Sequence, residues 1–129
     1  MPGVTGFLLE LEKLGVKTAA VSASRNAKFV LQRLGLNERF DVFLCESSEV
    51  GAAPAPQRFT AAAGELRCVP HTCVVVEDSA ENIRFARQLG MFTIGIGERK
   101  RLENAHLIIP SFVGVTPTEL FKKLEIAAN

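Results

Sequence analysis

Short apolar runs alternate with longer segments of helical period along the whole chain. The apolar runs cover residues 18–21, 40–44, 74–76, 93–96 and 107–109. Runs of this length, bounded by glycine, proline or polar residues, predict strands. The unbroken valine run at 74–76 predicts a strand that is fully buried.

Apolar residues between these runs recur at helical spacing. The predicted helices are residues 4–14, a segment with Phe29, Val30 and Leu34, residues 57–66, a segment with Ile83, Phe85, Ala86 and Leu89, and residues 118–124. Gly15, Gly35 and Gly90 follow helix ends, and Thr116 or Thr118 is the expected cap of the last helix. Because strand and helix alternate, we expect an α/β fold: one Rossmann-like, three-layer α/β/α domain with a mainly parallel sheet.

Composition excludes several classes of function. The chain has 129 residues and a net charge of +1, its basic residues are scattered, and all its aromatic residues are Phe, so no nucleic-acid surface is predicted. No apolar run approaches the roughly 18 residues that span a membrane, and no signal peptide is recognisable. Cys45, Cys68 and Cys73 lack metal-ligand spacing and fit small buried residues in a reducing cytoplasm, so a cytoplasmic location is expected.

Two adjacent carboxylates, Glu77 and Asp78, follow the valine run at 74–76. In open α/β sheets, ligands bind in the crevice beyond the carboxyl ends of the strands. Carboxylate oxygens at that place suit Mg²⁺, which takes one or two carboxylates and keeps several waters. The alternative is that Asp78 only caps the next helix and Glu77 is solvated.

A second polar segment, residues 22–26, lies where the strand at 18–21 meets the next helix. It supplies the hydroxyls of Ser22 and Ser24, the amide of Asn26 and free backbone N–H groups, which together suit a phosphate group. The alternative is an ordinary helix cap made by Ser24 or Asn26. A candidate Mg²⁺ site on a neighbouring strand end favours the phosphate interpretation.

The order of motifs along the chain resembles one family. V-S-A-S-R-N, L-G-L-N-E-R-F-D, E-V-G-A-A-P-A-P-Q-R-F, V-V-V-E-D-S-A-E-N-I and Q-L-G-M-F-T-I-G-I-G occur in that order. They resemble the haloacid dehalogenase (HAD) superfamily and, within it, the β-phosphoglucomutase-like phosphatases and mutases. The resemblance implies a HAD-like core, incomplete and without a cap domain, over residues 1–129, with Mg²⁺ as cofactor and a phosphorylated sugar or phosphate ion as ligand. It also assigns the site residues: phosphate to Ser22, Ala23, Arg25 and Asn26, and metal to Glu77 and Asp78.

The chain departs from the family in its catalytic residues. The family's nucleophile is the first Asp of a D-x-D motif on an amino-terminal strand, but here the aspartates are Asp41 and Asp78 and no D-x-D occurs. By the resemblance, the chain begins after the nucleophile strand and the cap, and Asp41 is structural. Ala53 stands at the position of the family's lysine, and Arg58 is the alternative cation. No catalytic residue is therefore assigned.

The absent strand has a structural consequence. In the family it lies between the strands that end here at Val21 and Val76, so both would have unpaired edges. We expect either that these two strands close up, or that a partner chain or a second copy pairs with the exposed edges. Among the remaining polar residues, His71 and His106 have no catalytic partner motif, and residues 99–101 are expected to form a solvated turn.

Three interpretations of function stay open on the sequence. The first is a β-phosphoglucomutase-like phosphotransferase or phosphatase core with weak or no activity alone, because the nucleophile is lacking. The second is a non-catalytic interaction module, which the change to Ala53 favours. The third is the C-terminal part of a split phosphosugar mutase or phosphatase that another chain completes in trans.

Overall fold

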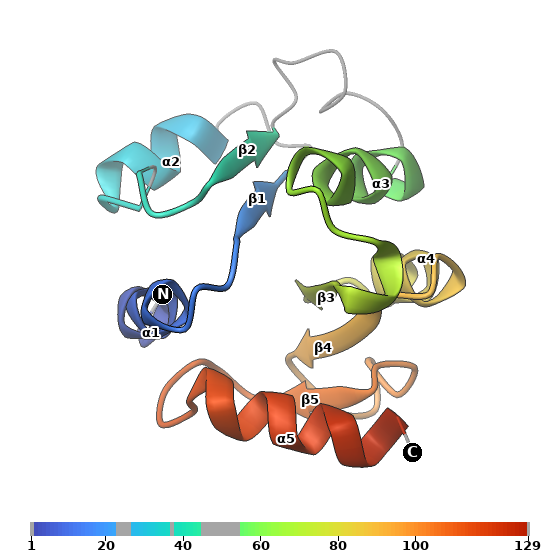
Figure 1. The fold of residues 1–129 in the computed structure, drawn as a ribbon. Helices are drawn as coiled ribbons and strands as arrows, with labels where there is room; N and C mark the ends of the chain where they lie inside the picture. Colours follow the sequence, from blue (N-terminus) through green and yellow to red (C-terminus); the bar gives the residue numbers. More distant parts are fainter. Residues whose placement is uncertain (1, 23–26, 37, 45–54, 129) are drawn as a thin grey trace.

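A computed structural model describes residues 2–22, 27–36, 38–44 and 55–128. In chain order the elements are α1 (Val4–Lys13), β1 (Ala19–Val21), α2 (Ala27–Arg33), β2 (Val42–Leu44), α3 (Ala55–Glu65), the 3₁₀ helix η1 (Pro70–Thr72), β3 (Val74–Glu77), α4 (Ala80–Gln88), β4 (Phe92–Ile96), β5 (Leu107–Ile109) and α5 (Pro117–Ala128). Helices and strands alternate, so the predicted α/β class is confirmed (Figure 1). The short helix η1 was not predicted.

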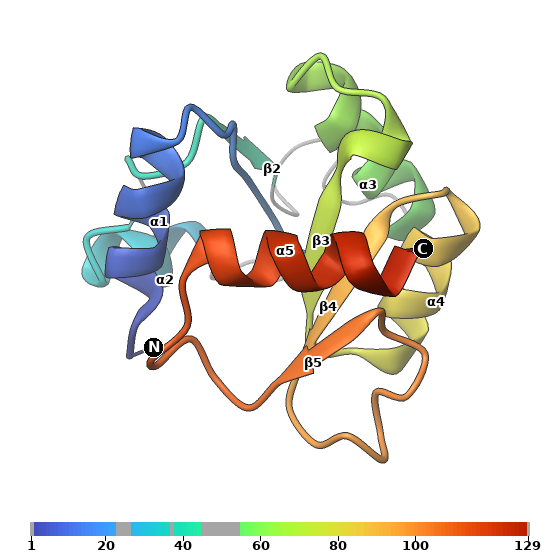
Figure 2. The same ribbon diagram turned by 60° about the horizontal axis from the view of Figure 1, so that its bottom comes forward.

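The sheet is divided into two parallel pieces. β1 pairs with β2, and β4 lies between β3 and β5. β1 and β3 are the facing strands of the two pieces in both ribbon views, and both run downward in Figure 2. In the described part of the chain they do not pair with each other, so the prediction that these strands close up is wrong.

Helices on both faces bridge the two pieces of the sheet. On one face α3 contacts β1, β2 and α4, and α4 packs on β3 and β4; on the other, α1 contacts α5, which contacts β5 (Figures 1 and 2). The larger core cluster lies on the α1 and α5 side and combines residues of both pieces: Val4, Phe7, Leu8, Leu11, Leu36, Ile94, Ile109, Leu120 and Leu124. The three-layer arrangement is therefore held together by helix packing across an interrupted sheet.

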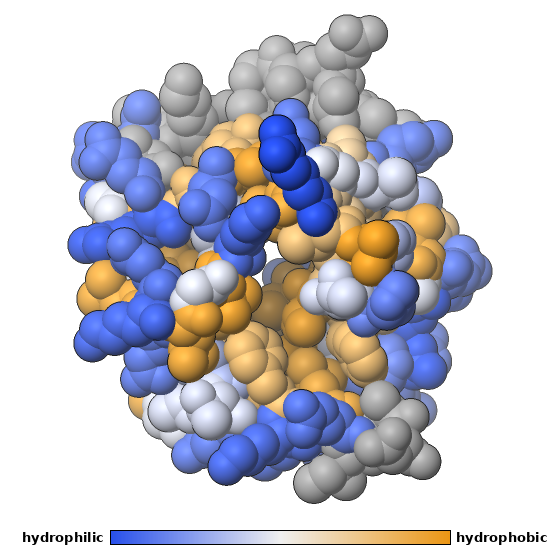
Figure 3. All heavy atoms as spheres, in the orientation of Figure 1, coloured by the Kyte–Doolittle hydropathy of each residue, from blue (hydrophilic) through white to orange (hydrophobic). Residues whose placement is uncertain are grey.

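The interruption changes the burial of the strands. The middle residues of β4, Thr93, Ile94 and Gly95, are all buried. β3 has a neighbour on one side only, and Val76 in it is 38% exposed, so the prediction of a fully buried strand at 74–76 is wrong. Figure 3 shows an opening near the centre of the molecule, bordered by both apolar and hydrophilic residues.

Two local predictions are confirmed by hydrogen bonds. Thr116 caps α5, since its Oγ1 accepts the N–H of Glu119 at 3.2 Å. Asp41 is structural: its Oδ2 accepts the N–H of Thr18 at 2.7 Å, and its own N–H donates to the Thr18 carbonyl at 2.9 Å. These two hydrogen bonds join Asp41 to Thr18 just before β1 and β2 begin to pair. β2 starts at the next residue, Val42.

The described helices include none that is both long and apolar enough to cross a membrane. Cys68 and Cys73 are free thiols and only half-buried, which corrects the expectation that they are buried residues. Burial, followed by the neighbouring Cys68, raises the pKa of the Cys73 thiol. Cys45 lies outside the described residues.

Candidate functional site

The described site residues lie at the carboxyl ends of β1 and β3, the two strands on either side of the gap between the two pieces of the sheet. Ser22 follows β1 directly, Glu77 is the last residue of β3, and Asp78 follows it. Because β1 and β3 run in the same direction, these residues belong to the same edge of the interrupted sheet (Figure 2). The N–H of Ser22 donates to the carbonyl of Leu44 at 2.9 Å, which fixes the start of this loop against β2.

The other residues assigned from the sequence lie only partly within the described part of the chain. Ala23, Arg25 and Asn26, and also Ala53, lie outside the described residues. Arg58, the alternative cation, is half-buried on α3.

Glu77 shapes the turn between β3 and α4. Its Oε1 accepts the N–H groups of Asp78 at 3.1 Å and Ser79 at 3.2 Å, and its Oε2 accepts from Asn82 Nδ2 at 3.3 Å. Ser79, not Asp78, caps α4, because its Oγ accepts the N–H of Asn82 at 3.3 Å. The alternative of a solvated Glu77 beside a capping Asp78 is therefore wrong on both points.

The electrostatics of the acidic pair favour a cation. Burial, followed by the hydrogen bond to the Asp78 carboxyl, raises the pKa of Glu77, while the donors from Ser79, Asn82 and the Asp78 backbone act in the opposite direction. Asp78 is exposed. Two adjacent carboxyl groups, one partly desolvated, repel each other when both are ionised, and a hard divalent cation removes that cost.

The donor set fits Mg²⁺ as part of a coordination shell. The pair supplies carboxylate oxygens and leaves the other positions to water or phosphate, as Mg²⁺ prefers. Within the described ranges no group of three or more His, Cys, Asp or Glu residues forms a metal cage. The residues present therefore suit a partly hydrated Mg²⁺ ion rather than one enclosed by protein.

Arg101 is a contact that sequence reasoning missed. Its Nη1 donates to the main-chain carbonyl of Asp78 at 2.5 Å, so the residue ties the turn after β4 to the acidic turn after β3. A Cβ at Gly97 would lie 2.8 Å from Arg101 Nη2, so the glycine leaves room for the Arg101 side chain to reach Asp78. Residues 99–101 were expected to form a solvated turn; Arg101 is exposed, yet it braces the site. The charge run itself gave no sign of this contact.

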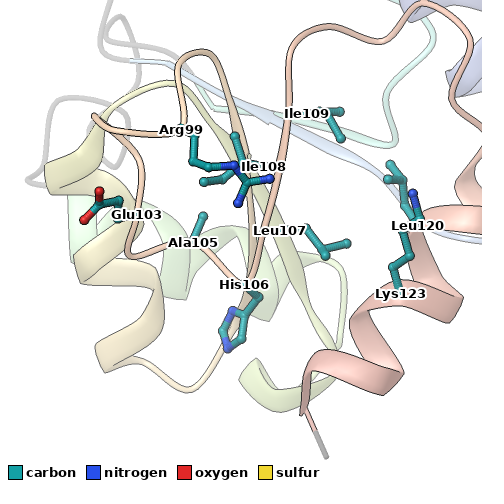
Figure 4. A pocket seen from close by; sticks show the side chains of 9 residues that line it. All are labelled: Arg99, Glu103, Ala105, His106, Leu107, Ile108, Ile109, Leu120 and Lys123. Atoms are coloured by element: carbon teal, nitrogen blue, oxygen red, sulfur yellow. The ribbon is translucent and has the colours of Figure 1, made fainter.

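A separate hollow of about 430 Å³ lies along β5 and α5 (Figure 4). Arg99, His106 and Lys123 are among its lining residues, whereas Ser22, Glu77 and Asp78 are not. His106 is held by Thr93: its Nδ1 accepts the Thr93 main-chain N–H at 3.0 Å, and the main-chain N–H of His106 donates to Thr93 Oγ1 at 3.0 Å. These bonds give His106 a structural role at the start of β5.

Comparison with known proteins finds the same family that the sequence motifs resemble. A family model described as haloacid dehalogenase-like hydrolase matches residues 1–90. The β-phosphoglucomutase of Bacillus subtilis (strain 168) is 29% identical over 109 residues, which are 84% of this chain and 48% of that protein. The chain thus spans about half the length of this relative.

Solved structures share the fold almost throughout. The crystal structure of a β-phosphoglucomutase from Clostridium difficile has a TM-score of 0.89 and 26% identity, over 99% of this chain and 57% of that one. A core domain from Streptococcus pneumoniae TIGR4 has a TM-score of 0.71 and, at 19% identity, supports the fold alone. That match covers 95% of this chain and 87% of the core domain, so only a small part of the core domain has no counterpart here.

Proposed function

We propose, from the premise that this chain belongs to the haloacid dehalogenase-like hydrolase family, that it forms the phosphate- and Mg²⁺-binding half of a phosphoryl-transfer site. The observation that carries the proposal is the acidic pair at the end of β3, at the same sheet edge as Ser22. The similarity to β-phosphoglucomutases favours a phosphorylated sugar as substrate, with phosphate ion as the simplest ligand.

Each residue has a role in this proposal. Asp78, exposed beside Glu77, would bind Mg²⁺ directly, while Glu77 holds the turn with its hydrogen bonds and adds a second carboxylate. When bound, the ion neutralises charge on the phosphoryl oxygens. Ser22, with the main chain of Ala23 and the side chains of Arg25 and Asn26, would donate to the same oxygens.

We propose that these 129 residues include none for the covalent step. A D-x-D motif is absent from the sequence, and Ala53 replaces the lysine of the family pattern. Removing one electrostatic contributor typically costs about 10²–10³ in rate. Removing the nucleophile closes the covalent route itself. We therefore propose that these 129 residues alone have weak or no phosphoryl-transfer activity.

Cation binding provides the first test. We expect Mg²⁺ to raise the melting temperature, since it binds the folded pair and relieves the repulsion between Glu77 and Asp78. Asp78→Asn removes one carboxylate and should weaken Mg²⁺ binding at least about tenfold by calorimetric titration. The matched control is Glu81→Gln, which removes an exposed carboxylate in the first turn of α4 and should leave Mg²⁺ affinity unchanged. Equal affinity in wild type and Asp78→Asn would refute the assignment.

Activity provides the second test. The chain is incubated with Mg²⁺, β-glucose 1-phosphate and a trace of the bisphosphate, and product is followed by ³¹P NMR. We expect no turnover above background, together with Mg²⁺-dependent shifts when inorganic phosphate binds. Turnover that Asp78→Ala abolishes would show that the chain holds a complete site and that the half-site proposal is wrong.

A further inference from the structure

We propose that Arg101 is a positioning residue of the candidate Mg²⁺ site, and that it acts through the peptide bond between Asp78 and Ser79. The inference rests on the proposed function, because it takes Glu77 and Asp78 as the residues that bind the ion. Arg101 does not contact the ion in this proposal. It fixes the main chain from which the Asp78 carboxylate extends, so that the carboxylate is in place before Mg²⁺ binds.

The peptide unit between Asp78 and Ser79 is held at both ends. Its carbonyl oxygen accepts from Arg101 Nη1 at 2.5 Å, and its N–H donates to Glu77 Oε1 at 3.2 Å. Because a peptide unit is planar, these two bonds fix the orientation of one rigid group. They also form a continuous chain from a guanidinium through a peptide to a carboxylate. Hydrogen bonds in such a chain polarise one another, so each strengthens the next.

The main chain on the other side of the Asp78 Cα is held as well. The Asp78 N–H donates to the same Glu77 Oε1 at 3.1 Å. Hydrogen bonds therefore restrain both peptide units that flank this Cα. The orientations of the two units define the backbone dihedrals of Asp78, and these decide which side-chain rotamers are allowed. Loss of the Arg101 bond would release one of the two units.

Arg101 can hold this peptide because its own main chain is anchored. β3 and β4 are parallel neighbours, so the turn that follows β4 lies at the same sheet edge as the acidic pair. Leu102 is fully buried, and its N–H donates to the carbonyls of Glu98 and Arg99 at 3.2 Å. The Arg101 N–H donates to the Glu98 carbonyl at 3.2 Å. The guanidinium thus extends to the acidic turn from a fixed turn.

Helix stability alone does not favour a guanidinium at this place. α4 begins at Ala80 with Ser79 as its N-cap, so the bond from Arg101 lies at the helix end that carries partial positive charge. Carboxylates are favourable near a helix N-terminus, and cations are not. The contact is therefore better explained by the acidic turn that it holds than by the helix that follows.

Arg101 has two opposing effects on Mg²⁺ binding. Its positive charge repels the ion, whereas its hydrogen bond orients a ligand of the ion. The residue is exposed, and charges that face water and salt interact weakly. Residues that orient a metal ligand typically contribute about 10–100-fold to metal affinity. We therefore expect positioning to dominate, so that Arg101 strengthens Mg²⁺ binding.

Calorimetric titration with Mg²⁺ measures which effect dominates. Arg101→Ala should weaken Mg²⁺ binding about tenfold, although it removes a charge that repels the ion. Arg101→Lys keeps the charge and one donor group, so its affinity should lie between those of Arg101→Ala and wild type. The matched control is Arg99→Ala, which removes the same charge from the same turn. Arg99 is exposed and lines the hollow along β5, so this control should bind Mg²⁺ at least as tightly as wild type.

A second variant displaces the guanidinium and keeps its charge. Gly97→Ala places a methyl group 2.8 Å from Arg101 Nη2, so the side chain must move and Mg²⁺ binding should weaken as in Arg101→Ala. Thermal unfolding without Mg²⁺ shows whether each variant is folded at the temperature of the titration. Gly97 has φ at 140°, which other residues rarely adopt. If Gly97→Ala does not fold, the Arg101 variants still decide.

NMR of the metal-free protein tests the chain of hydrogen bonds by itself. In Arg101→Ala the amide proton of Ser79 should move upfield, because its peptide unit loses the donor on the carbonyl and the N–H becomes a weaker donor. The Asp78 amide donates to the same carboxylate oxygen but belongs to the preceding peptide unit, so its resonance should move less. Arg99→Ala should move neither resonance. An unchanged Ser79 amide in Arg101→Ala would refute the chain from Arg101 to Glu77.

The titrations also separate this inference from the proposed function. Mg²⁺ affinity in Arg101→Ala that equals or exceeds that of wild type would overturn the positioning role. If Asp78→Asn weakens Mg²⁺ binding and Arg101→Ala does not, the proposed function stands and only the role of Arg101 is refuted. Absence of Mg²⁺ binding in wild type would refute both.

Discussion

β4 and β3 are both largely apolar strands, but their surroundings differ. β4 pairs with β3 on one side and with β5 on the other. Before β5 begins, the N–H of the fully buried Thr93 is satisfied by the imidazole of His106. Thus a side chain completes the ladder of β4 where a strand is lacking. The outer edge of β3 has no strand beside it in the described residues, and Val76 is exposed.

The comparison shows that burial of a strand is set by its neighbours as much as by its composition. Three consecutive valines in β3 have the apolar character of a central strand, yet they form an edge. β-propensity measures how well a residue packs on a half-buried pleated surface, so it predicts a strand and not its place in the sheet. In the described residues the strand edges at the gap are unpaired, whereas β4 is paired on both sides. A substitution should therefore lower the free energy of unfolding less at the gap than in β4.

The largest difference is expected between Ile94 and Val76. Ile94 in β4 is 1% exposed and belongs to the main core cluster. Ile94→Ala should lower the free energy of unfolding by about 2–5 kcal/mol, because it removes buried methyl groups and leaves a cavity. Val76→Ala should lower it by about 1 kcal/mol or less, since much of that side chain already meets water. Urea denaturation of both variants measures the two values.

Equal losses for the two variants would contradict this contrast. They would mean that Val76 is as buried in solution as Ile94, and therefore that another chain or a second copy already covers β3. Repeating the measurement over a range of protein concentrations distinguishes a second copy, because its effect on stability depends on concentration.

A second prediction concerns the helix that bridges the two pieces. Gly3 precedes α1 with φ at 85°, and a Cβ there would lie 2.7 Å from the carbonyl carbon and oxygen of Phe112. Phe7 of α1 packs on the ring of Phe112 with centroids 5.0 Å apart. Gly3→Ala should destabilise the protein by about 2–4 kcal/mol, since it combines left-handed backbone strain with a collision against main chain.

Gly6 provides the matched control within the same helix. A Cβ at Gly6 would meet nothing within 4 Å, and the residue is exposed. Gly6→Ala should therefore stabilise the protein by about 0.5–1 kcal/mol through helix propensity. Thermal unfolding of both variants checks the opposite signs. A loss of stability in Gly6→Ala similar to that in Gly3→Ala would show that α1 tolerates no added methyl, and the role of Phe112 would be refuted.

The sequence predicts the elements well because each depends on local pattern. Helix ends, strand runs and the position of Glu77 and Asp78 after β3 all come from neighbours in the chain. The split between β1 and β3 is a property of the whole sheet, which local pattern does not encode. The family resemblance offered two outcomes for it, and the structure excludes one of them.

The contacts of Arg101 with Asp78 and of His106 with Thr93 join residues far apart in sequence. No periodicity encodes such contacts, so the sequence could not predict them. The assignments to Ala23, Arg25 and Asn26 rest on the resemblance and stay predictions.

The smallest effect is a dependence of stability on pH at the completed edge of β4. Burial, assisted by the Arg87 guanidinium, lowers the pKa of His106 from its usual 6.5, and its Nδ1 must stay unprotonated to accept the Thr93 N–H. The folded state thus binds fewer protons than the unfolded state just below pH 6.5. The contribution of His106 to stability is full above that pH and declines as pH falls below it.

Glu77 acts with the opposite sign, so the two must be separated. Its pKa is raised from 4.5, so the folded state favours the proton and acidification through that range stabilises the protein. Unfolding free energies of wild type and His106→Ala between pH 5 and 8, taken as a difference, isolate the histidine, and the difference should shrink as pH falls below about 6.5. A difference that grows on acidification would mean that the folded state prefers charged His106. The imidazole could not then complete the ladder of β4, and that edge would be as open as the edge of β3.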